Sequence, residues 1–255
     1  MNDSISGNEA TRSGSPFFWV EAELVERSAA QRYAKVRLVG ERLPEKIGAG
    51  QFVLVRTGED PCLPRAFSVL GAADGEIELF VKCEGRVREK FAASPYGTVF
   101  EVRGPYGVPY IDKINPRRKY ILVGGGSGSA PLLYFKRQHP ELVEDTVFGF
   151  RTADACDVLT DVPLVVEELG GQRADLQAKA LWRPGLGVIA CGPEPMLRSL
   201  AARHRGQPDV YVSLEARIGC GIGTCLGCSI PTPSGTQRIC REGPLFSVDE
   251  LPWLM

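Results

Sequence analysis

Hydrophobic and polar residues alternate over several short segments in the first part of the chain. The pattern occupies residues 18–25, 33–39, 51–55 and 77–82, with glycines and prolines between the segments. Successive side chains of a strand point to opposite faces, so this alternation is typical of strands with one buried face. Residues 17–113 are therefore predicted to form an all-β barrel or sandwich, with a later strand at 99–102 and a turn at 104–107.

The pattern changes near Pro116. An apolar run at 119–123 is followed by a glycine-rich segment and then by a helical pattern that reaches about Gln138. Further strands are predicted at 146–150, 187–191 and 210–214, and a further helix at 196–204, whereas 164–169 fits either a strand or a helix. Strands that alternate with helices indicate a parallel sheet with crossover helices, so residues 114–212 are predicted to form an α/β domain.

Four cysteines near the end of the chain have uneven spacing: Cys220, Cys225, Cys228 and Cys240. This is C-x4-C-x2-C with a distant fourth cysteine, the plant-type ferredoxin arrangement that binds a [2Fe–2S] cluster. Three thiolates must converge from one loop, and the glycines between them allow the tight backbone that this requires. Residues 213–255 are therefore predicted to form a small cluster-binding subdomain.

Two other uses of these cysteines remain as alternatives. A zinc site of four cysteines usually combines two C-x2-4-C pairs, whereas this chain has a triple and a single cysteine. Disulfides are not expected, because no N-terminal segment has the pattern of a secretory signal. Residues 1–16 are polar and rich in Ser, Asn and Gly, and are predicted to be a disordered tail.

Composition narrows the function classes. The chain has 255 residues, of which 44% are hydrophobic and 24% charged, as in an ordinary globular protein. Its formal net charge of −1 gives no reason to expect binding to nucleic acid or to an anionic membrane. No apolar run reaches the roughly 18 residues that span a bilayer, so we expect a cytoplasmic protein without a membrane span.

Three motifs suggest cofactor binding. The glycine-rich segment after residue 123 follows a strand and begins a helix, where free backbone N–H groups attract phosphate. Cys191, Gly192 and Pro193 lie at the carboxyl end of another strand of the same sheet and supply a second wall of a nucleotide cleft. In the barrel, the segment 65–68 combines an arginine for phosphate with an aromatic ring for stacking. Each motif taken alone is also compatible with a plain turn or strand.

The order of these motifs resembles the ferredoxin–NADP reductase superfamily and, within it, the electron-transfer subunits of NAD-dependent dihydroorotate dehydrogenases. The stretches 213–223 and 239–246 are the most specific part of the likeness. The resemblance implies FAD in the barrel, NAD(H) in the α/β domain and a [2Fe–2S] cluster at the C-terminal end. It also implies an FMN-containing catalytic partner subunit in a heterotetramer of two copies each, and electron flow from dihydroorotate to NAD⁺ in pyrimidine biosynthesis.

The resemblance also assigns residues. It implies that the flavin is bound by Arg65, Phe67, Ser68, Val81, Lys82, Gly85, Arg86 and Val87. It implies that the nicotinamide dinucleotide is bound by Gly124, Gly126, Gly128, Cys191, Gly192 and Pro193. It implies that the cluster is bound by Cys220, Cys225, Cys228 and Cys240. The segment 85–88 departs from the family by lacking a threonine, for which Arg86 or Arg88 is the substitute on phosphate.

These assignments predict an electron relay in which no side chain acts as a general acid or base. Two alternatives remain open from the sequence. The first is the diaphorase subunit of a cytosolic hydrogenase or sulfite reductase, which combines the same three modules. The second is a non-catalytic redox sensor that contains an iron–sulfur cluster.

Overall fold

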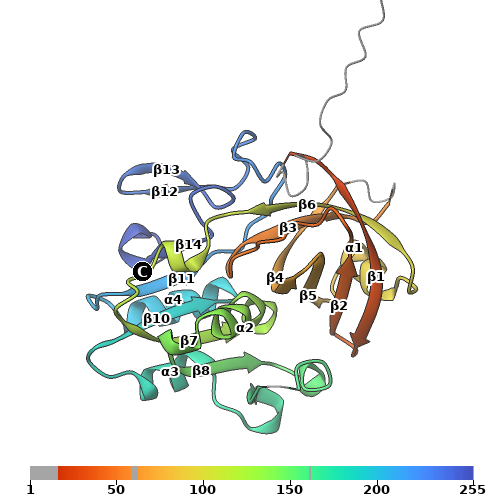
Figure 1. The fold of residues 1–255 in the computed structure, drawn as a ribbon. Helices are drawn as coiled ribbons and strands as arrows, with labels where there is room; N and C mark the ends of the chain where they lie inside the picture. The colour runs from red at the N-terminus through yellow and green to blue at the C-terminus, as the bar shows by residue number, and fades with distance from the viewer. Residues whose placement is uncertain (1–16, 59–62, 161, 255) are drawn as a thin grey trace, which may run out of the picture.

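The computed structural model describes residues 17–58, 63–160 and 162–254. The tail predicted over residues 1–16 lies outside this range. Figure 1 shows a barrel, a mixed sheet with helices, and a C-terminal hairpin above the sheet. The predicted combination of β-barrel, α/β domain and C-terminal cysteine segment is confirmed. The domain boundaries at residues 113 and 212 stay predictions.

The first unit is a closed antiparallel barrel with the strand order β1-β2-β5-β4-β3-β6. Its strands are β1 (Val20–Ala29), β2 (Tyr33–Val39), β3 (Phe52–Arg56), β4 (Arg65–Ala73), β5 (Glu76–Lys82) and β6 (Val99–Tyr106). Alternate residues of β6 are buried, as the sequence pattern predicts for a strand with one face toward a core. Strand β6 extends through most of the segment predicted to be a turn, and the chain turns at Gly107, whose φ is +83°.

The segment after β5 forms a helix that the sequence pattern does not predict. Only Gly85, with φ of +82°, forms a turn, and the helix α1 (Arg86–Ala93) begins directly after it. The reason is packing: the ring of Phe91 on α1 lies 5.1 Å from that of Phe67 and 4.7 Å from that of Phe100, measured between centroids. These long-range contacts stabilise a short helix that the local glycine and charged residues do not predict.

The second unit is a sheet with the strand order β14-β11-β10-β7-β8-β9. Its strands are β7 (Lys119–Gly125), β8 (Val143–Phe150), β9 (Leu164–Val166), β10 (Leu186–Cys191), β11 (Val210–Ser213) and β14 (Leu245–Ser247). All neighbours are parallel except β14, which pairs antiparallel with β11. The segment 164–169, left open from the sequence, begins as a strand and ends in a single 3₁₀ turn.

Helices cover both faces of this sheet. They are α2 (Ser129–Gln138), α3 (Ala174–Leu181) and α4 (Glu194–Arg203). Helix α2 packs against β7 and also against β4 of the barrel, whereas α3 packs against α4 on the other face. Accordingly Tyr120 and Leu122 of β7 belong to the core shared with the barrel, and Ile121 and Val123 to the core under α3 and α4.

The C-terminal segment is attached to the sheet. Its hairpin consists of β12 (Ser229–Thr232) and β13 (Gly235–Arg238), and β14 then joins the sheet beside β11. The remaining elements are single 3₁₀ turns at Tyr110–Asp112, Gly126–Gly128, Pro140–Leu142, Ala153–Ala155, Glu167–Leu169 and Val248–Glu250. None of the described helices is long and apolar enough to cross a membrane.

Candidate cofactor cleft and cysteine loop

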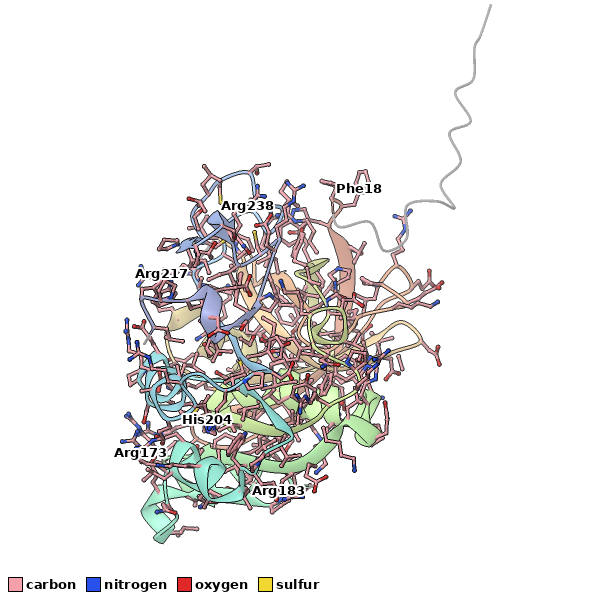
Figure 2. The ribbon with its side chains drawn as sticks, turned by 90° about the vertical axis from the view of Figure 1, so that its left-hand side faces the viewer. Phe18, Arg173, Arg183, His204, Arg217 and Arg238 are labelled. Carbon is pink, nitrogen blue, oxygen red and sulfur yellow. The ribbon has the colours of Figure 1, made fainter. Side chains whose placement is uncertain are left out.

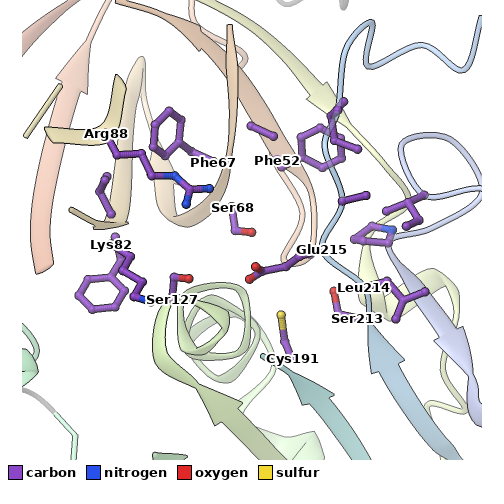
Figure 3. A pocket seen from close by; sticks show the side chains of 18 residues that line it. Phe52, Phe67, Ser68, Lys82, Arg88, Ser127, Cys191, Ser213, Leu214 and Glu215 are labelled. Carbon is purple, nitrogen blue, oxygen red and sulfur yellow. The ribbon is translucent and has the colours of Figure 1, made fainter. Parts of the chain in front are cut away.

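A cleft lies between the barrel and the carboxyl ends of the sheet strands (Figure 3). It encloses about 750 Å³ of empty space, part of which is open solvent. Open α/β sheets bind ligands outside the carboxyl ends of their strands, so the position is the one that the sheet topology favours.

Strands β4 and β5 form the barrel wall of the cleft. Of the residues assigned to flavin, Phe67 and Ser68 line it from β4, and Val81 and Lys82 line it from β5. Strict alternation predicts that only every second residue of β4 faces the cleft. Instead three consecutive residues, 66–68, line it, so both faces of the strand contribute. Arg65 lies outside the lining, and its Nη1 donates to the carbonyl oxygens of Leu63 and Pro64 at 3.3 Å.

Of the two arginines offered as substitutes for the missing threonine, one lines the cleft, and its binding to phosphate stays a prediction. Arg88, on the first turn of α1, lines the cleft, and Figure 3 shows its guanidinium extending toward Ser68. Gly85 and Arg86 do not contribute to the lining. The Gly85 N–H instead donates to Glu89 Oε1 at 3.1 Å. Residues of a helix share a face when they are three or four positions apart. Arg86 and Arg88 are two positions apart, so only one of them can face the cleft.

The sheet wall joins the two motifs that the sequence predicted to meet. A Cβ at Gly128 would lie 2.5 Å from the carbonyl carbon and oxygen of Cys191, so the glycine permits backbone to pack on backbone. A Cβ at Gly125 would lie 2.9 Å from Pro193 Cδ and 2.8 Å from Met196 Sδ. The glycine-rich turn and the end of β10 therefore form one continuous surface, from which Ser127 and Cys191 line the cleft.

The other predicted dinucleotide residues lie behind this surface. A Cβ at Gly124 would lie 2.6 Å from Ser129 Oγ, and one at Gly192 would lie 3.0 Å from Gly125 Cα. Gly126 has a φ of +57°, which favours glycine. Pro193 ends the segment and precedes α4. These residues shape the turn, and their contact with a dinucleotide stays a prediction.

Cys191 is a neutral thiol at the floor of the cleft. Its side chain is buried, and burial raises the pKa of the thiol well above its usual range, with the nearby Glu215 carboxyl acting in the same direction. The hydroxyl of Tyr110 is buried close to this thiol. A neutral, buried thiol suits a contact surface for a ring and does not suit a nucleophile.

Glu215 is the site residue that the sequence analysis missed. Figure 3 shows its carboxyl pointing into the space between Ser68 and Cys191. The side chain reaches solvent through the open cleft, yet protein surrounds it closely enough that desolvation raises the pKa of the carboxyl, against the opposing charges of Arg88 and Lys82. Its position just after a predicted strand of an open sheet is the sequence signal that could have identified it as a site residue.

Three of the four predicted cluster ligands lie in the loop between β11 and β12, and Cys240 follows β13. Cys220 is half-buried, Cys225 exposed, and Cys228 and Cys240 buried, with 3.3 Å between the last two Sγ atoms. A Cβ at Gly219 or Gly227 would lie 3.6 Å from Cys225 Sγ. Gly221 and Gly223 have φ of +77° and +83°, so these glycines permit the curled backbone around the thiols.

Hydrogen bonds favour the thiolate form at Cys220. Burial opposes its ionisation, but backbone N–H groups of Cys225 and Ile222 and the Thr224 hydroxyl lower the pKa of this thiol to about 6. Burial beside Cys228 raises the pKa of Cys240 to about 12. In the part of the chain that the structure describes, no three His, Cys, Asp or Glu side chains converge as ligands of a single metal ion. Soft thiol donors presented by N–H groups fit an iron–sulfur cluster.

Comparison with solved structures identifies the fold. The NADH-dependent reduced ferredoxin-NADP oxidoreductase that carries out flavin-based electron bifurcation superposes with a TM-score of 0.79 at 24% identity, covering 91% of this chain and 90% of the other. Phthalate dioxygenase reductase superposes with a TM-score of 0.59 at 17% identity, covering 78% and 70%. The chain thus has the same fold as these reductases.

Sequence relatives identify the family within that fold. The "Dihydroorotate dehydrogenase B (NAD(+)), electron transfer subunit" of Shouchella clausii is 31% identical over 241 residues, which cover 84% of this chain and 90% of the relative. The subunit of the same name from Bacillus caldolyticus is 31% identical, covering 89% and 95%. Residues 215–252 match the family model "Iron-sulfur cluster binding domain of dihydroorotate dehydrogenase B". The chain belongs to the family of these electron transfer subunits, and the resemblance drawn from its motifs is confirmed.

The raised pKa of Glu215 predicts a pH-dependent stability effect. A carboxyl whose folded pKa exceeds its unfolded pKa contributes stability below the unfolded value, about 4.3 for Glu, and loses it as pH rises through the folded value. In flavin-free protein, Glu215→Gln should therefore raise Tm relative to wild type at about pH 8 and leave it unchanged at about pH 4. Thermal unfolding at both pH values measures the effect.

The matched control for this variant is Glu41→Gln, which removes one negative charge at an exposed position away from the cleft. A Glu215→Gln variant with the same Tm as wild type at both pH values would contradict the desolvation of this carboxyl.

Proposed function

We propose that this chain relays electrons between NAD(H) and a catalytic partner subunit through FAD in the cleft and a [2Fe–2S] cluster at the four cysteines. One observation supports this most directly. The end of β11 and the residues after it line the cleft with Ser213, Leu214 and Glu215, and the chain reaches the first cluster cysteine, Cys220, five residues after Glu215. Ile239, which precedes Cys240, also lines the cleft. The two cofactor sites are therefore adjacent.

The cleft fits a flavin. Phe67 supplies a buried aromatic surface, and Ser68 and Cys191 supply small polar groups from opposite walls. Arg88 supplies a planar cation for phosphate at one side, and Arg65 lies at the beginning of the same strand as Phe67. We assign the isoalloxazine ring to the space between β4 and the end of β10, with the phosphates toward α1.

The dinucleotide NAD(H) fits the sheet wall. The glycine-rich turn brings free N–H groups to the beginning of α2, where a pyrophosphate is stabilised. The Cys191–Pro193 segment lies against that turn, so a nicotinamide bound there would reach the same cleft as the flavin. The names of the relatives specify NAD(+), and we propose NAD(H) for this chain.

The bound groups supply the chemistry: a hydride exchanged with NAD(H), the flavin as the junction between two-electron and one-electron transfer, and the cluster as the one-electron carrier. The chain's residues contribute binding and order. The two walls position the rings, the buried thiol of Cys191 adds no charge, and the thiols hold the cluster close to the cleft. No side chain in this arrangement is required as a general acid or base.

The relatives are subunits of a dehydrogenase, so a partner is part of the proposal. We propose an FMN-containing subunit that oxidises dihydroorotate, in a heterotetramer of two copies each, with electrons passing to NAD⁺. The complex would act in the cytoplasm, as expected from the sequence. The exposed side chains of Cys225 and Leu226 place the cysteine loop at the surface, where a partner has access.

An anaerobic visible spectrum of the purified chain, recorded before and after NADH, tests the relay. The proposal predicts flavin bands together with cluster absorbance, and bleaching of both on addition of NADH. Cluster absorbance without flavin would instead support a redox sensor. A colourless preparation that contains zinc would support the structural zinc alternative.

Cys225→Ser tests whether the two cofactor sites are separable. Cys225 is exposed and does not line the cleft, so the variant should lose the cluster and its iron while NADH still bleaches the flavin. Iron analysis and the anaerobic spectrum measure both effects. The control is Cys156→Ser, at an exposed cysteine outside the loop, which should retain both cofactors. Loss of flavin bleaching in Cys225→Ser alone would contradict separable sites.

Arg217→Glu tests the partner surface. Arg217 is exposed between β11 and the cysteine loop, so reversal of its charge should weaken assembly with the catalytic subunit without loss of iron (Figure 2). Size-exclusion chromatography of the mixed subunits measures assembly. Arg205→Glu makes the same charge change at an exposed position after α4 and should leave assembly intact. Equal assembly of the two variants would contradict a partner at the loop.

A further inference from the structure

Arg103 connects the barrel to the cysteine loop. It lies on β6, and its Nη2 donates to the carbonyl oxygen of Cys220 at 3.0 Å, although the two residues are 117 positions apart. Its guanidinium carbon lies 4.5 Å from the ring centroid of Trp19 and 5.9 Å from that of Tyr106. The Tyr106 ring in turn lies under Gly221, where a Cβ would approach it to 2.7 Å. Arg103 is thus held against the loop on several sides.

Arg103 differs from the neighbouring arginines because its guanidinium has no carboxylate partner within the described part of the chain. Arg56, which lies 4.3 Å from the same Trp19 centroid, forms an ion pair with Glu101 at 2.6 Å. Arg238, on the other side of the loop, binds Glu242 through its Nε and Nη2. Among the described residues, no carboxylate lies within 4.0 Å of a nitrogen of Arg103.

The environment of Arg103 makes the lack of a carboxylate partner energetically unfavourable. Its Nε is buried and has no hydrogen-bond partner in the described structure. Nearby negative charge offsets the desolvation of a half-buried cation. The thiols of the loop, once deprotonated around iron, are the negative groups that its position offers.

We propose that Arg103 is a positioning residue for the [2Fe–2S] site, whose unpaired positive charge raises the reduction potential of the cluster. This inference rests on the proposed function. Cluster potentials depend on net charge, on nearby hydrogen bonds and on solvent exposure. The reduced cluster carries one more negative charge than the oxidised cluster, so a fixed cation beside it favours the reduced form.

The test compares Arg103→Gln, which removes the charge, with Arg103→Lys, which keeps it. An EPR-monitored redox titration of the purified chain gives the ratio of reduced to oxidised cluster at each potential. Arg103→Gln should lower this ratio about tenfold at a fixed potential, which corresponds to 59 mV for a one-electron couple. Arg103→Lys should stay close to wild type. A loaded Arg103→Gln protein with the wild-type potential would overturn the proposal.

A structural control separates charge from packing. The double variant Arg56→Gln/Glu101→Gln removes a neighbour of the same Trp19 ring but leaves the net charge unchanged. Its potential should equal that of wild type. A shift in this variant as large as in Arg103→Gln would mean that packing on Trp19 sets the potential, and would overturn the role of charge.

Two further outcomes are informative. If Arg103→Gln fails to retain iron, Arg103→Lys decides. A wild-type potential in this variant supports the proposal, and a potential about 59 mV below wild type overturns it. Iron content and the visible spectrum, recorded for every variant, establish that the cluster is present. A wild-type chain without a [2Fe–2S] signal would instead refute the proposed function, so the two failures are distinguishable.

Discussion

The packing of α2 on the barrel holds the two halves of the cleft together. From this helix, the Tyr134 hydroxyl lies within hydrogen-bond distance of the carbonyl oxygens of Ile47, at 3.0 Å, and Ala72, at 3.2 Å. Gln138 accepts from the Ala49 N–H at 2.8 Å. Backbone groups on the barrel surface are thus paired with one helix of the sheet domain, and the buried face of α2 completes a core common to both. Because these contacts are directional, they set the separation of the cleft walls.

The separation of the cleft walls determines where the glycine-rich turn lies. The turn leads from β7 into α2, and α2 is held against the barrel, so the turn stands at the cleft opposite β4 and β5. Its glycines allow the end of β10 to approach to van der Waals distance, which brings Ser127 and Cys191 into one wall. Any side chain at Gly128 would separate the two strand ends and widen the floor of the cleft.

The C-terminal segment then brings the cysteine loop to the same place. It leaves the sheet at Ser213, lines the cleft, forms the loop and returns through β14 beside β11. Pairing of β14 with β11 anchors both ends of the loop on the rigid sheet. The loop is also held from the barrel side by Arg103 and Tyr106. The two proposed cofactor sites therefore share one framework and need no mobile element between them.

Much of this arrangement could be predicted from the sequence because its determinants are local. Alternation over residues 33–39 and 77–82 predicts strands, an apolar run before glycines predicts β7 and its turn, and the cysteine spacing predicts the loop. Helix α1 could not be predicted, since its stability comes from Phe91 packing on strands of the barrel. The hairpin of β12 and β13 and the helix α3 were also not predicted, because their local patterns are short.

Within the site, the local motifs identified Phe67, Ser68, Cys191 and the four cysteines, since each belongs to a recognisable run of residues. Only the tertiary structure decided that Arg88 and not Arg86 faces the cleft, that Glu215 points between its walls, and that Arg103 reaches Cys220. These choices depend on which elements lie side by side, and on the desolvation and charge that result. The sequence by itself determined the kinds of element and the donor groups, because periodicity and spacing are local, whereas the meeting of distant side chains depends on packing.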